Sequence, residues 1–269
     1  MKKLVLLCTM LLPSAVGFCQ EKMEVEGAII IKNSEDTSPA AGTIRFNTTT
    51  NDFEGWNGHQ WLSLTRLRES GDGVTDADGN TYTTVKLGTQ EWMVENLKTT
   101  KYNDNIGILN VTDNTQWSGL DVSETGAWCY YDNLASNNST YGKLYNWYAV
   151  NTGKLCPTGW DVPSDAEWTT LTDYLGGSGI AGGKMKEAGT THWISPNTGA
   201  SNESGFTGLP GGFRNTSGTF LNLGLYGYWW SSTESGANAW YRDLDYFDDN
   251  VYRDFIGKRL GFSVRCVRD

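Results

Sequence analysis

The chain has 269 residues and a formal net charge of −10, with 31 acidic and 21 basic residues. This acidity argues against a nucleic-acid-binding protein, because such binding depends on Lys and Arg side chains that neutralise phosphates. Aromatic residues make up 13% of the chain and glycine contributes 32 residues, a composition that predicts an aromatic-rich core interrupted by many turns.

Residues 1–19 have the organisation of a secretory signal peptide. Two lysines precede an apolar run at residues 4–16, and residues 17–19 (Gly-Phe-Cys) fit a cleavage site. The apolar run is shorter than the roughly 20 residues that a membrane-spanning helix needs. Acylation of Cys19 as a lipoprotein anchor is a weaker alternative, because Phe18 is larger than the residue expected before such a cysteine. We therefore expect a secreted or cell-surface protein with no transmembrane helix.

Residues 20–65 are predicted to form a small β-rich module. An Asn-Gly pair between alternating residues is the strongest short hairpin signal. So short a segment with few bulky apolar side chains is marginal on its own. We therefore expect the module to pack on a neighbour or to mediate oligomerisation. The predicted strands are residues 28–31, 43–46, 53–56 and 60–64, with the hairpin turn at Asn57-Gly58.

Residues 66–74 are predicted to be a linker, and residues 75–269 the main domain. Residues 76–80 (Asp-Ala-Asp-Gly-Asn) resemble the start of a calcium loop, but Leu87 stands where such a loop has its bidentate Glu. A hairpin turn at Asp78-Gly79 is therefore the favoured interpretation. No cofactor is expected, and Ca²⁺ remains an open alternative without a clear motif.

The clearest helix signal is the capping box at residues 164–167 (Ser-Asp-Ala-Glu). In such a box the serine oxygen accepts the backbone N–H of the Glu, whose side chain reaches back to the serine backbone. Apolar residues then repeat at helical spacing until Gly176-Gly177 ends the helix. A second helix is predicted at residues 141–150 and a helical turn at residues 182–188.

Further strands are predicted late in the chain, at residues 240–246, 251–255 and 262–267. In the last of these, Phe262 and Cys266 share one face because side chains alternate along a strand. Strands that gather after two helices predict an α+β fold with an antiparallel sheet.

Cleavage of the signal peptide leaves three cysteines, Cys129, Cys156 and Cys266. Export permits a disulfide, and three cysteines allow three pairings between which the sequence alone does not choose. A bridge between Cys156 and Cys266 would close a loop of about 110 residues, worth about 4–5 kcal/mol in the chain-entropy model. Cys129 is then most simply a small buried hydrophobe.

Catalytic and metal-binding motifs are not apparent. The mature sequence has no Cys-x-x-Cys, no paired histidines, no Gly-x-Ser-x-Gly elbow and no phosphate loop. Asp243 and Asp245 share a strand face, but a glycosidase needs two carboxyl groups across a cleft, and nothing marks such a pair. We therefore assign no catalytic residue and no metal ligand.

Two polar and aromatic segments are candidates for ligand binding. Aromatic rings beside amide and carboxylate groups suit the recognition of sugars or peptides. The favoured alternative is that the aromatic residues alternate across a strand and fill the core. The candidate ligand-binding residues are Asn202, Glu203, Tyr228, Trp229, Trp230 and Glu234.

The same segments resemble the Fibrobacter succinogenes major paralogous domain. The resemblance covers roughly residues 74–269 and is specific, because many motifs occur in the same order. Asp161 departs from the pattern, which has His after Cys-Pro-Thr-Gly-Trp, and the change removes a metal or proton-transfer group. The matching segments are residues 78–80, 92–97, 128–131, 141–147, 156–168, 202–212, 229–234 and 261–268.

The resemblance implies a C-type-lectin-like, formylglycine-generating-enzyme-like layout with short antiparallel strands, two main helices and long loops. It also implies a bridge between Cys156 before a helix and Cys266 in the last strand. The catalytic cysteines of the enzyme relatives cannot be matched here, so their activity does not carry over. We expect a non-enzymatic exported module that binds glycan or a surface protein. The alternatives are a hydrolase or modifying enzyme on the same scaffold, and a structural component of a surface assembly.

Overall fold

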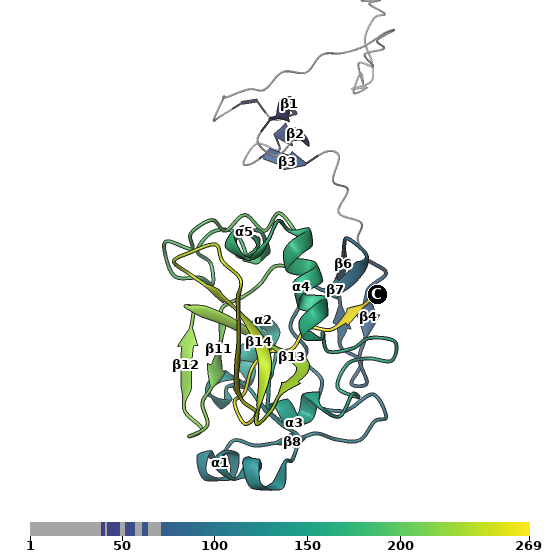
Figure 1. Cartoon of the computed structure of the whole chain (residues 1–269), viewed down its shortest axis with the longest axis vertical. Coiled ribbons are helices and arrows are strands. Elements are labelled where there is room, and N and C mark those ends of the chain that lie inside the picture. The colour runs from purple at the N-terminus through teal and green to yellow at the C-terminus, as the bar shows by residue number, and fades with distance from the viewer. Residues whose placement is uncertain (1–38, 41, 49–51, 57–60, 64–70) are drawn as a thin grey trace, which may run out of the picture. The chain divides into compact units, whose positions relative to one another are not determined.

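The computed structural model describes residues 39–40, 42–48, 52–56, 61–63 and 71–269. The described residues fall into two units, one within residues 1–67 and one within residues 68–269 (Figure 1). In this part of the chain no helix is long and apolar enough to cross a membrane. The predicted signal peptide, the strand at residues 28–31 and the turn at Asn57-Gly58 lie outside the described residues.

The first unit contains a three-stranded antiparallel sheet, as the strand predictions at residues 43–64 anticipated. Arg45 joins its neighbours: its guanidinium pairs with the Glu54 carboxylate at 2.8 Å and lies 4.1 Å from the centroid of the Trp61 ring. Charge pairing and ring contacts therefore hold this small sheet together. The strands are β1 (Ile44–Asn47), β2 (Asp52–Trp56) and β3 (Trp61–Ser63).

The second unit begins, among the described residues, with a segment that pairs with its first strands. Of the predicted linker, residues 71–74 are hydrogen-bonded into this unit, since the Gly71 N–H donates to the Thr84 carbonyl at 2.9 Å. The C-terminal strand pairs with a strand near residue 90, so the two ends of the unit meet (Figure 1). These strands are β4 (Val74–Thr75), β5 (Thr81–Tyr82), β6 (Thr84–Leu87), β7 (Gln90–Met93) and β16 (Val267–Arg268).

The acidic segment at residues 76–80 is a turn between β4 and β5, as predicted. The Asp76 carboxylate accepts hydrogen bonds from the backbone N–H groups of Asp78 and Asn80, both at 2.9 Å, and from the Tyr82 hydroxyl at 2.5 Å. Gly79 has a φ of 83°, which glycine adopts without strain. The oxygens of Asp76 thus serve the turn itself.

The single helix predicted at residues 141–150 is wrong as a continuous element, because only Tyr141 and residues 147–150 of this span are helical. Gly142 interrupts it with a φ of 72°, and a Cβ at this position would lie 2.8 Å from the Leu97 carbonyl oxygen. Shortly after it, Leu144 and Tyr145 form a strand in a small sheet of order β10-β9-β8. Two short helices therefore flank a strand, and tertiary pairing overrides the helical spacing of the apolar residues. The elements are β8 (Leu109–Asn110), β9 (Ala127–Cys129), α2 (Asn138–Tyr141), β10 (Leu144–Tyr145) and α3 (Trp147–Val150).

The capping-box helix is confirmed as α4 (Asp165–Tyr174). The Ser164 hydroxyl accepts the Glu167 N–H at 3.2 Å, and the Ser164 N–H donates back to the Glu167 carboxylate at 2.6 Å. The next helix, α5 (Ser178–Met185), begins four residues before the predicted turn of helix. Three further helical segments precede these helices: α1 (Asn114–Ser123) and the 3-10 turns at Tyr131–Asn133 and Ala135–Asn137.

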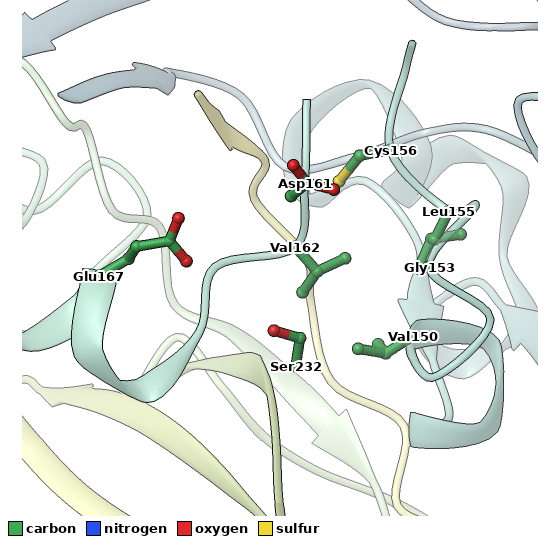
Figure 2. A pocket seen from close by; sticks show the side chains of 8 residues that line it. All are labelled: Val150, Gly153, Leu155, Cys156, Asp161, Val162, Glu167 and Ser232. Atoms are coloured by element: carbon green, nitrogen blue, oxygen red, sulfur yellow. The ribbon is translucent and has the colours of Figure 1, made fainter. Parts of the chain in front are cut away.

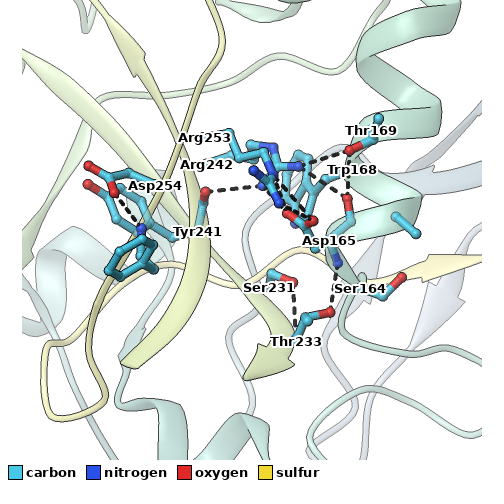
Figure 3. Close-up of polar contacts among 12 residues, drawn as sticks. Ser164, Asp165, Trp168, Thr169, Ser231, Thr233, Tyr241, Arg242, Arg253 and Asp254 are labelled. Carbon is cyan, nitrogen blue, oxygen red and sulfur yellow. Dashed lines mark hydrogen bonds and ion pairs between the residues drawn. The ribbon is translucent and has the colours of Figure 1, made fainter. Parts of the chain in front are cut away.

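The largest sheet has the strand order β12-β11-β13-β14-β15, with β11 and β13 parallel and the other pairs antiparallel. Its last two strands confirm the strands predicted at residues 240–246 and 251–255. Helix α4 is tied to it, because Asp165 pairs with Arg242 and Arg253, each at 2.8 Å (Figure 3). The strands are β11 (Gly211–Arg214), β12 (Phe220–Leu223), β13 (Tyr226–Ser235), β14 (Asn238–Asp245) and β15 (Tyr252–Gly257).

The C-terminal tail is less regular than predicted. Of residues 262–267 only Val267 belongs to a strand, while Phe262 and Ser263 form single bridges to Tyr145 and Trp229. The expected alternation nevertheless holds, since Phe262, Val264 and Cys266 all belong to one buried cluster. The tail is buried on both sides and lies between two cores. The second unit is therefore a mixed α+β domain with several small sheets.

Candidate functional site

A disulfide joins Cys156, before α4, to Cys266 in the tail, with 5.9 Å between the two Cα atoms. This confirms the pairing that the family resemblance implied. Cys129 is free and fully buried, and burial raises the pKa of its thiol to about 12. A thiol in that state is protonated and inert at neutral pH. Cys129 is therefore a core residue and a poor nucleophile.

The motif segments meet in the interior at Asn96. Its side-chain oxygen accepts from Trp229 Nε1 at 2.8 Å and from Arg265 Nε at 3.1 Å. Its side-chain nitrogen donates to the Tyr141 carbonyl at 2.9 Å and to Ser263 Oγ at 3.2 Å. An amide side chain offers two donors and two acceptor positions, so Asn96 is fully satisfied. We call Asn96, Trp229, Ser263 and Arg265 the tail cluster.

The structure removes Trp229 and Trp230 from the candidate ligand contacts. The two side chains are 1% and 0% exposed and enter different cores on opposite faces of β13. The Trp230 indole N–H donates to the Tyr145 carbonyl at 2.8 Å, so its polar atom is also satisfied inside. Both tryptophans therefore fill the core from alternate faces of a strand, which is the alternative that the sequence analysis favoured over ligand binding. Tyr228, between core and surface, stays half-buried.

The other three candidate residues are engaged within their own neighbourhoods. Asn202 closes its own loop, because its side chain donates to Thr207 Oγ1 and accepts the Thr207 N–H, both at 2.9 Å. Glu203 lies 4.0 Å from the Lys184 ammonium. Glu234 is exposed at the end of β13 and pairs with Lys258. Their role in ligand binding remains a prediction.

A set of tyrosines and aspartates shares one face of β13, β14 and β15. The register across these strands, together with the two-residue period of side chains, fixes its composition. Asp243 lies at its centre: Tyr228 and Tyr252 are its partners on the two neighbouring strands, and Tyr241 and Asp245 are its neighbours along β14. This tyrosine–aspartate face consists of Tyr226, Tyr228, Tyr241, Asp243, Asp245, Tyr252 and Asp254.

Asp243 is the unusual member of the face. Its side chain is only 8% exposed, and within the described part of the chain its carboxyl group has no hydrogen-bond partner. Burial, followed by the negative charges of Asp245, Asp254 and Asp248, raises its pKa to about 7. Buried carboxyl groups are normally hydrogen-bonded, because an unpaired one costs free energy. The Asp243 oxygens are not among the fully buried unpaired atoms of the described residues, so this largely buried carboxyl group still reaches solvent at the surface of the face.

The tyrosines around Asp243 are held in fixed positions. The Tyr228 hydroxyl accepts a hydrogen bond from Asn222 Nδ2 at 2.9 Å. The Tyr226 and Tyr228 rings stack with centroids 5.7 Å apart, and Phe262 stacks on Tyr228 at 5.0 Å. Phe262 thus covers the face near Tyr241, whereas Tyr252 at the other edge is 40% exposed. Ordered rings next to a carboxyl group can contact a ligand's apolar side and its polar groups at once.

The buried Lys186 side chain holds the loop after β14 through hydrogen bonds to its backbone. Its ammonium donates to three carbonyl oxygens, those of Thr198, Asp245 and Asp248, at 2.8, 2.7 and 2.6 Å. This buried cation fills a carbonyl cage of the kind that hard cations use. No group of three Asp, Glu, His or Cys side chains suited to a metal ion occurs among residues 71–269 or in the described strands before them.

Sequence reasoning found part of this face. It placed Asp243 and Asp245 on one strand face, which the structure confirms, and it named Tyr228 as a ligand-binding candidate, which stays a prediction. It missed Tyr226, Tyr241 and Tyr252, and it missed the central position of Asp243. The alternating Tyr-x-Asp-x-Asp pattern of β14 was a usable signal, but the pairing of three strands that completes the face was not visible.

Comparison with known families identifies the domain. Residues 85–268 match the family model of the Fibrobacter succinogenes major domain, and the chain belongs to this family. A search of the curated proteins found no match, and a search of the solved structures found none either. The matched segment contains the tail cluster, the disulfide and the whole tyrosine–aspartate face.

Proposed function

We propose that this protein is an exported, non-enzymatic module that binds glycan through the tyrosine–aspartate face. The observation that carries the proposal is the largely buried Asp243 carboxyl group, which reaches solvent, has no hydrogen-bond partner in the described chain and has tyrosines beside it on both neighbouring strands. Sugar hydroxyls are strong partners for a carboxyl group, and the C–H faces of a sugar pack on aromatic rings. A lectin-like layout, suggested by the family resemblance and the Cys156–Cys266 bridge, agrees with this role.

Export is part of the proposal. The signal peptide predicted at residues 1–19 would carry the chain out of the cytoplasm. In the oxidising environment outside, a disulfide between Cys156 and Cys266 would persist. We favour a secreted or cell-surface product over a lipoprotein anchored at Cys19. The small β module at residues 20–65 would then link the binding domain to a surface protein or to other copies of the chain. Light scattering of the exported protein tests the last point, and a strict monomer would contradict assembly through this module.

A glycan array probed with the disulfide-bonded protein tests the proposed function, followed by calorimetry with the best soluble oligosaccharide. We expect binding that Asp243→Asn weakens at least tenfold and that Tyr252→Ala weakens several-fold. The matched controls are Asp173→Asn and Tyr174→Ala, which change an exposed Asp and Tyr on α4. Equal losses from the control variants, or an array without any bound glycan, would contradict the proposal.

A hydrolase on the same face is the second candidate. The raised pKa of Asp243, about 7, is the value that a general acid needs at neutral pH. Its neighbour Asp245 lies two residues along the same strand, rather than across a cleft as glycosidase carboxylates do. Chromatography of the array's best oligosaccharide after long incubation separates the candidates, because binding alone leaves the oligosaccharide intact.

A further inference from the structure

A separate pocket lies beside the disulfide, at the start of α4. It has a volume of about 280 Å³ and is lined by residues from α3, from the loop that contains Cys156, from the first turn of α4 and from β13 (Figure 2). Cys156 itself is part of the wall, so the bridge to Cys266 fixes one side of the pocket. Nothing in the proposed function uses this pocket.

The pocket combines aliphatic walls with acidic and hydroxyl groups. Val150, Leu155 and Val162 are buried residues that form the apolar part. Asp161, Glu167 and Ser232 supply oxygen atoms, as Figure 2 shows. The described residues that line the pocket include no aromatic ring and no Lys, Arg or His. The pocket is therefore both apolar and negatively charged, unlike the tyrosine–aspartate face.

The negative charge is not neutralised from the neighbouring elements. The two arginines that reach the first turn of α4, Arg242 and Arg253, pair with Asp165, which does not line the pocket (Figure 3). The Glu167 carboxylate uses one of its oxygens, Oε2, to accept the Ser164 N–H. Asp161 is exposed, and its backbone is held by reciprocal hydrogen bonds with Val267, each of 2.9 Å. Among the described residues, neither the Asp161 nor the Glu167 carboxylate is paired with a Lys, Arg or His side chain.

Size and chemistry together select the occupant. Pockets for drug-sized ligands measure about 300–1,000 Å³, so this pocket of about 280 Å³ lies at the small end of that range and has room for a side chain. A sugar lacks an aromatic partner here, and two carboxylates and a hydroxyl supply at most five of the six to eight oxygens that a calcium ion takes. A lysine side chain has an aliphatic stem for the valine and leucine walls and an ammonium with three donors for the three oxygen-bearing groups.

We propose that this pocket binds a lysine side chain of a partner polypeptide. The lysine stem packs on Val150, Leu155 and Val162, and its ammonium is shared by Asp161, Glu167 and Ser232. The acidic chain, with its net charge of −10, attracts a basic partner toward the pocket over a longer range. The pocket thus gives the domain a protein-binding site that is independent of its glycan-binding face.

Heteronuclear NMR of the ¹⁵N-labelled, disulfide-bonded chain tests the proposal with three capped pentapeptides, Gly-Gly-X-Gly-Gly, where X is lysine, norleucine or arginine. We expect the lysine peptide to shift the amide signals of Gly153, Val162 and Ser232 in a saturable manner at millimolar concentration. Norleucine keeps the stem without the charge and should give no saturable shift. An arginine peptide that binds as tightly as the lysine peptide would overturn the assignment to lysine.

Two variants and one control complete the test. Asp161→Asn and Glu167→Gln should each weaken lysine-peptide binding at least fivefold. Glu167→Gln keeps the capping box, because glutamine also serves at that position, so α4 should remain folded. Asp173→Asn, near the other end of α4, should bind the lysine peptide as the wild type does. Unchanged binding by Asp161→Asn, or an absence of saturable shifts with the lysine peptide, would overturn the proposal.

Discussion

The tail cluster and the tyrosine–aspartate face lie in the same domain but differ in how fully their buried polar side chains are hydrogen-bonded. Around Asn96 every side-chain donor and acceptor has a partner, and the buried Arg265 guanidinium donates to the carbonyls of Phe206 and Thr207. On the face, Asp243 is almost as deeply buried and has no such partner in the described chain. A satisfied interior network stabilises a fold, whereas a largely buried carboxyl group among other carboxylates has a raised pKa and destabilises the fold when it is ionised.

Removing the disulfide should cause the largest loss in the free energy of unfolding. The Cys156→Ala, Cys266→Ala double variant frees the tail from the centre of the domain over a sequence separation of 110 residues. We expect the free energy of unfolding to fall by about 4–5 kcal/mol in the chain-entropy model. Urea unfolding monitored by tryptophan fluorescence measures it. A loss below about 1 kcal/mol would show that the tail is held without the bridge.

Asn96→Ala should cause the next largest loss in the free energy of unfolding. It leaves Trp229 Nε1, Arg265 Nε and the Tyr141 carbonyl without their partner in the interior. Unsatisfied buried polar groups cost about 1–3 kcal/mol each, so we expect a loss of about 3 kcal/mol after relaxation. Asn103→Ala, which removes one half-buried hydrogen bond to the Cys156 carbonyl, is the matched control and should cost less than about 1 kcal/mol. Equal losses would contradict the central role of Asn96.

Asp243→Asn should change stability in the opposite direction. The folded-state pKa of about 7 lies above the ordinary value of 3.8, so the folded chain holds the proton more strongly than the unfolded chain. Wild-type stability should therefore fall as the pH rises from about 4 to about 7 and then level off. The variant lacks this fall and should be more stable above pH 7 by about 2–4 kcal/mol. Parallel stability curves for the two proteins from pH 4 to pH 8 would contradict the account.

The smallest effect that we expect is that of a thiol reagent on Cys129 in the folded protein. Its thiol is fully buried and its pKa is raised to about 12, so a thiol reagent at pH 8 should leave it unmodified in the native protein. Peptide mass mapping after native labelling, and again after labelling in denaturant, measures the difference. Rapid modification of the native protein would restore Cys129 as a candidate nucleophile and favour the enzyme alternative.

The sequence predicted the features whose causes are local. The capping box at Ser164, the turn at Asp78-Gly79 and the alternation of Phe262 and Cys266 depend on neighbouring residues, and all three are present in the structure. The helix predicted at residues 141–150 failed because Gly142 lies directly against the Asn96–Leu97 backbone, a contact made across 45 residues of sequence.

The candidate site shows the same limit. The aromatic run at residues 228–230 could be assigned to a strand, but its sequence did not say which rings enter the core. Likewise the pair Asp243 and Asp245 was visible, whereas the tyrosines that surround Asp243 come from β13 and β15 through long-range strand register. A site built across three strands depends on pairings that no single segment encodes.

The most direct test of the central claim is a pH titration of the Asp243 side-chain carboxyl, followed by ¹³C NMR in the oxidised protein. We expect a midpoint near pH 7, because Asp243 is largely buried among carboxylates without a hydrogen-bond donor in the described chain. A midpoint at or below pH 4 would mean that the group is already satisfied within the fold. The Asp243 carboxyl group would then have no free hydrogen-bonding capacity for a ligand at the tyrosine–aspartate face.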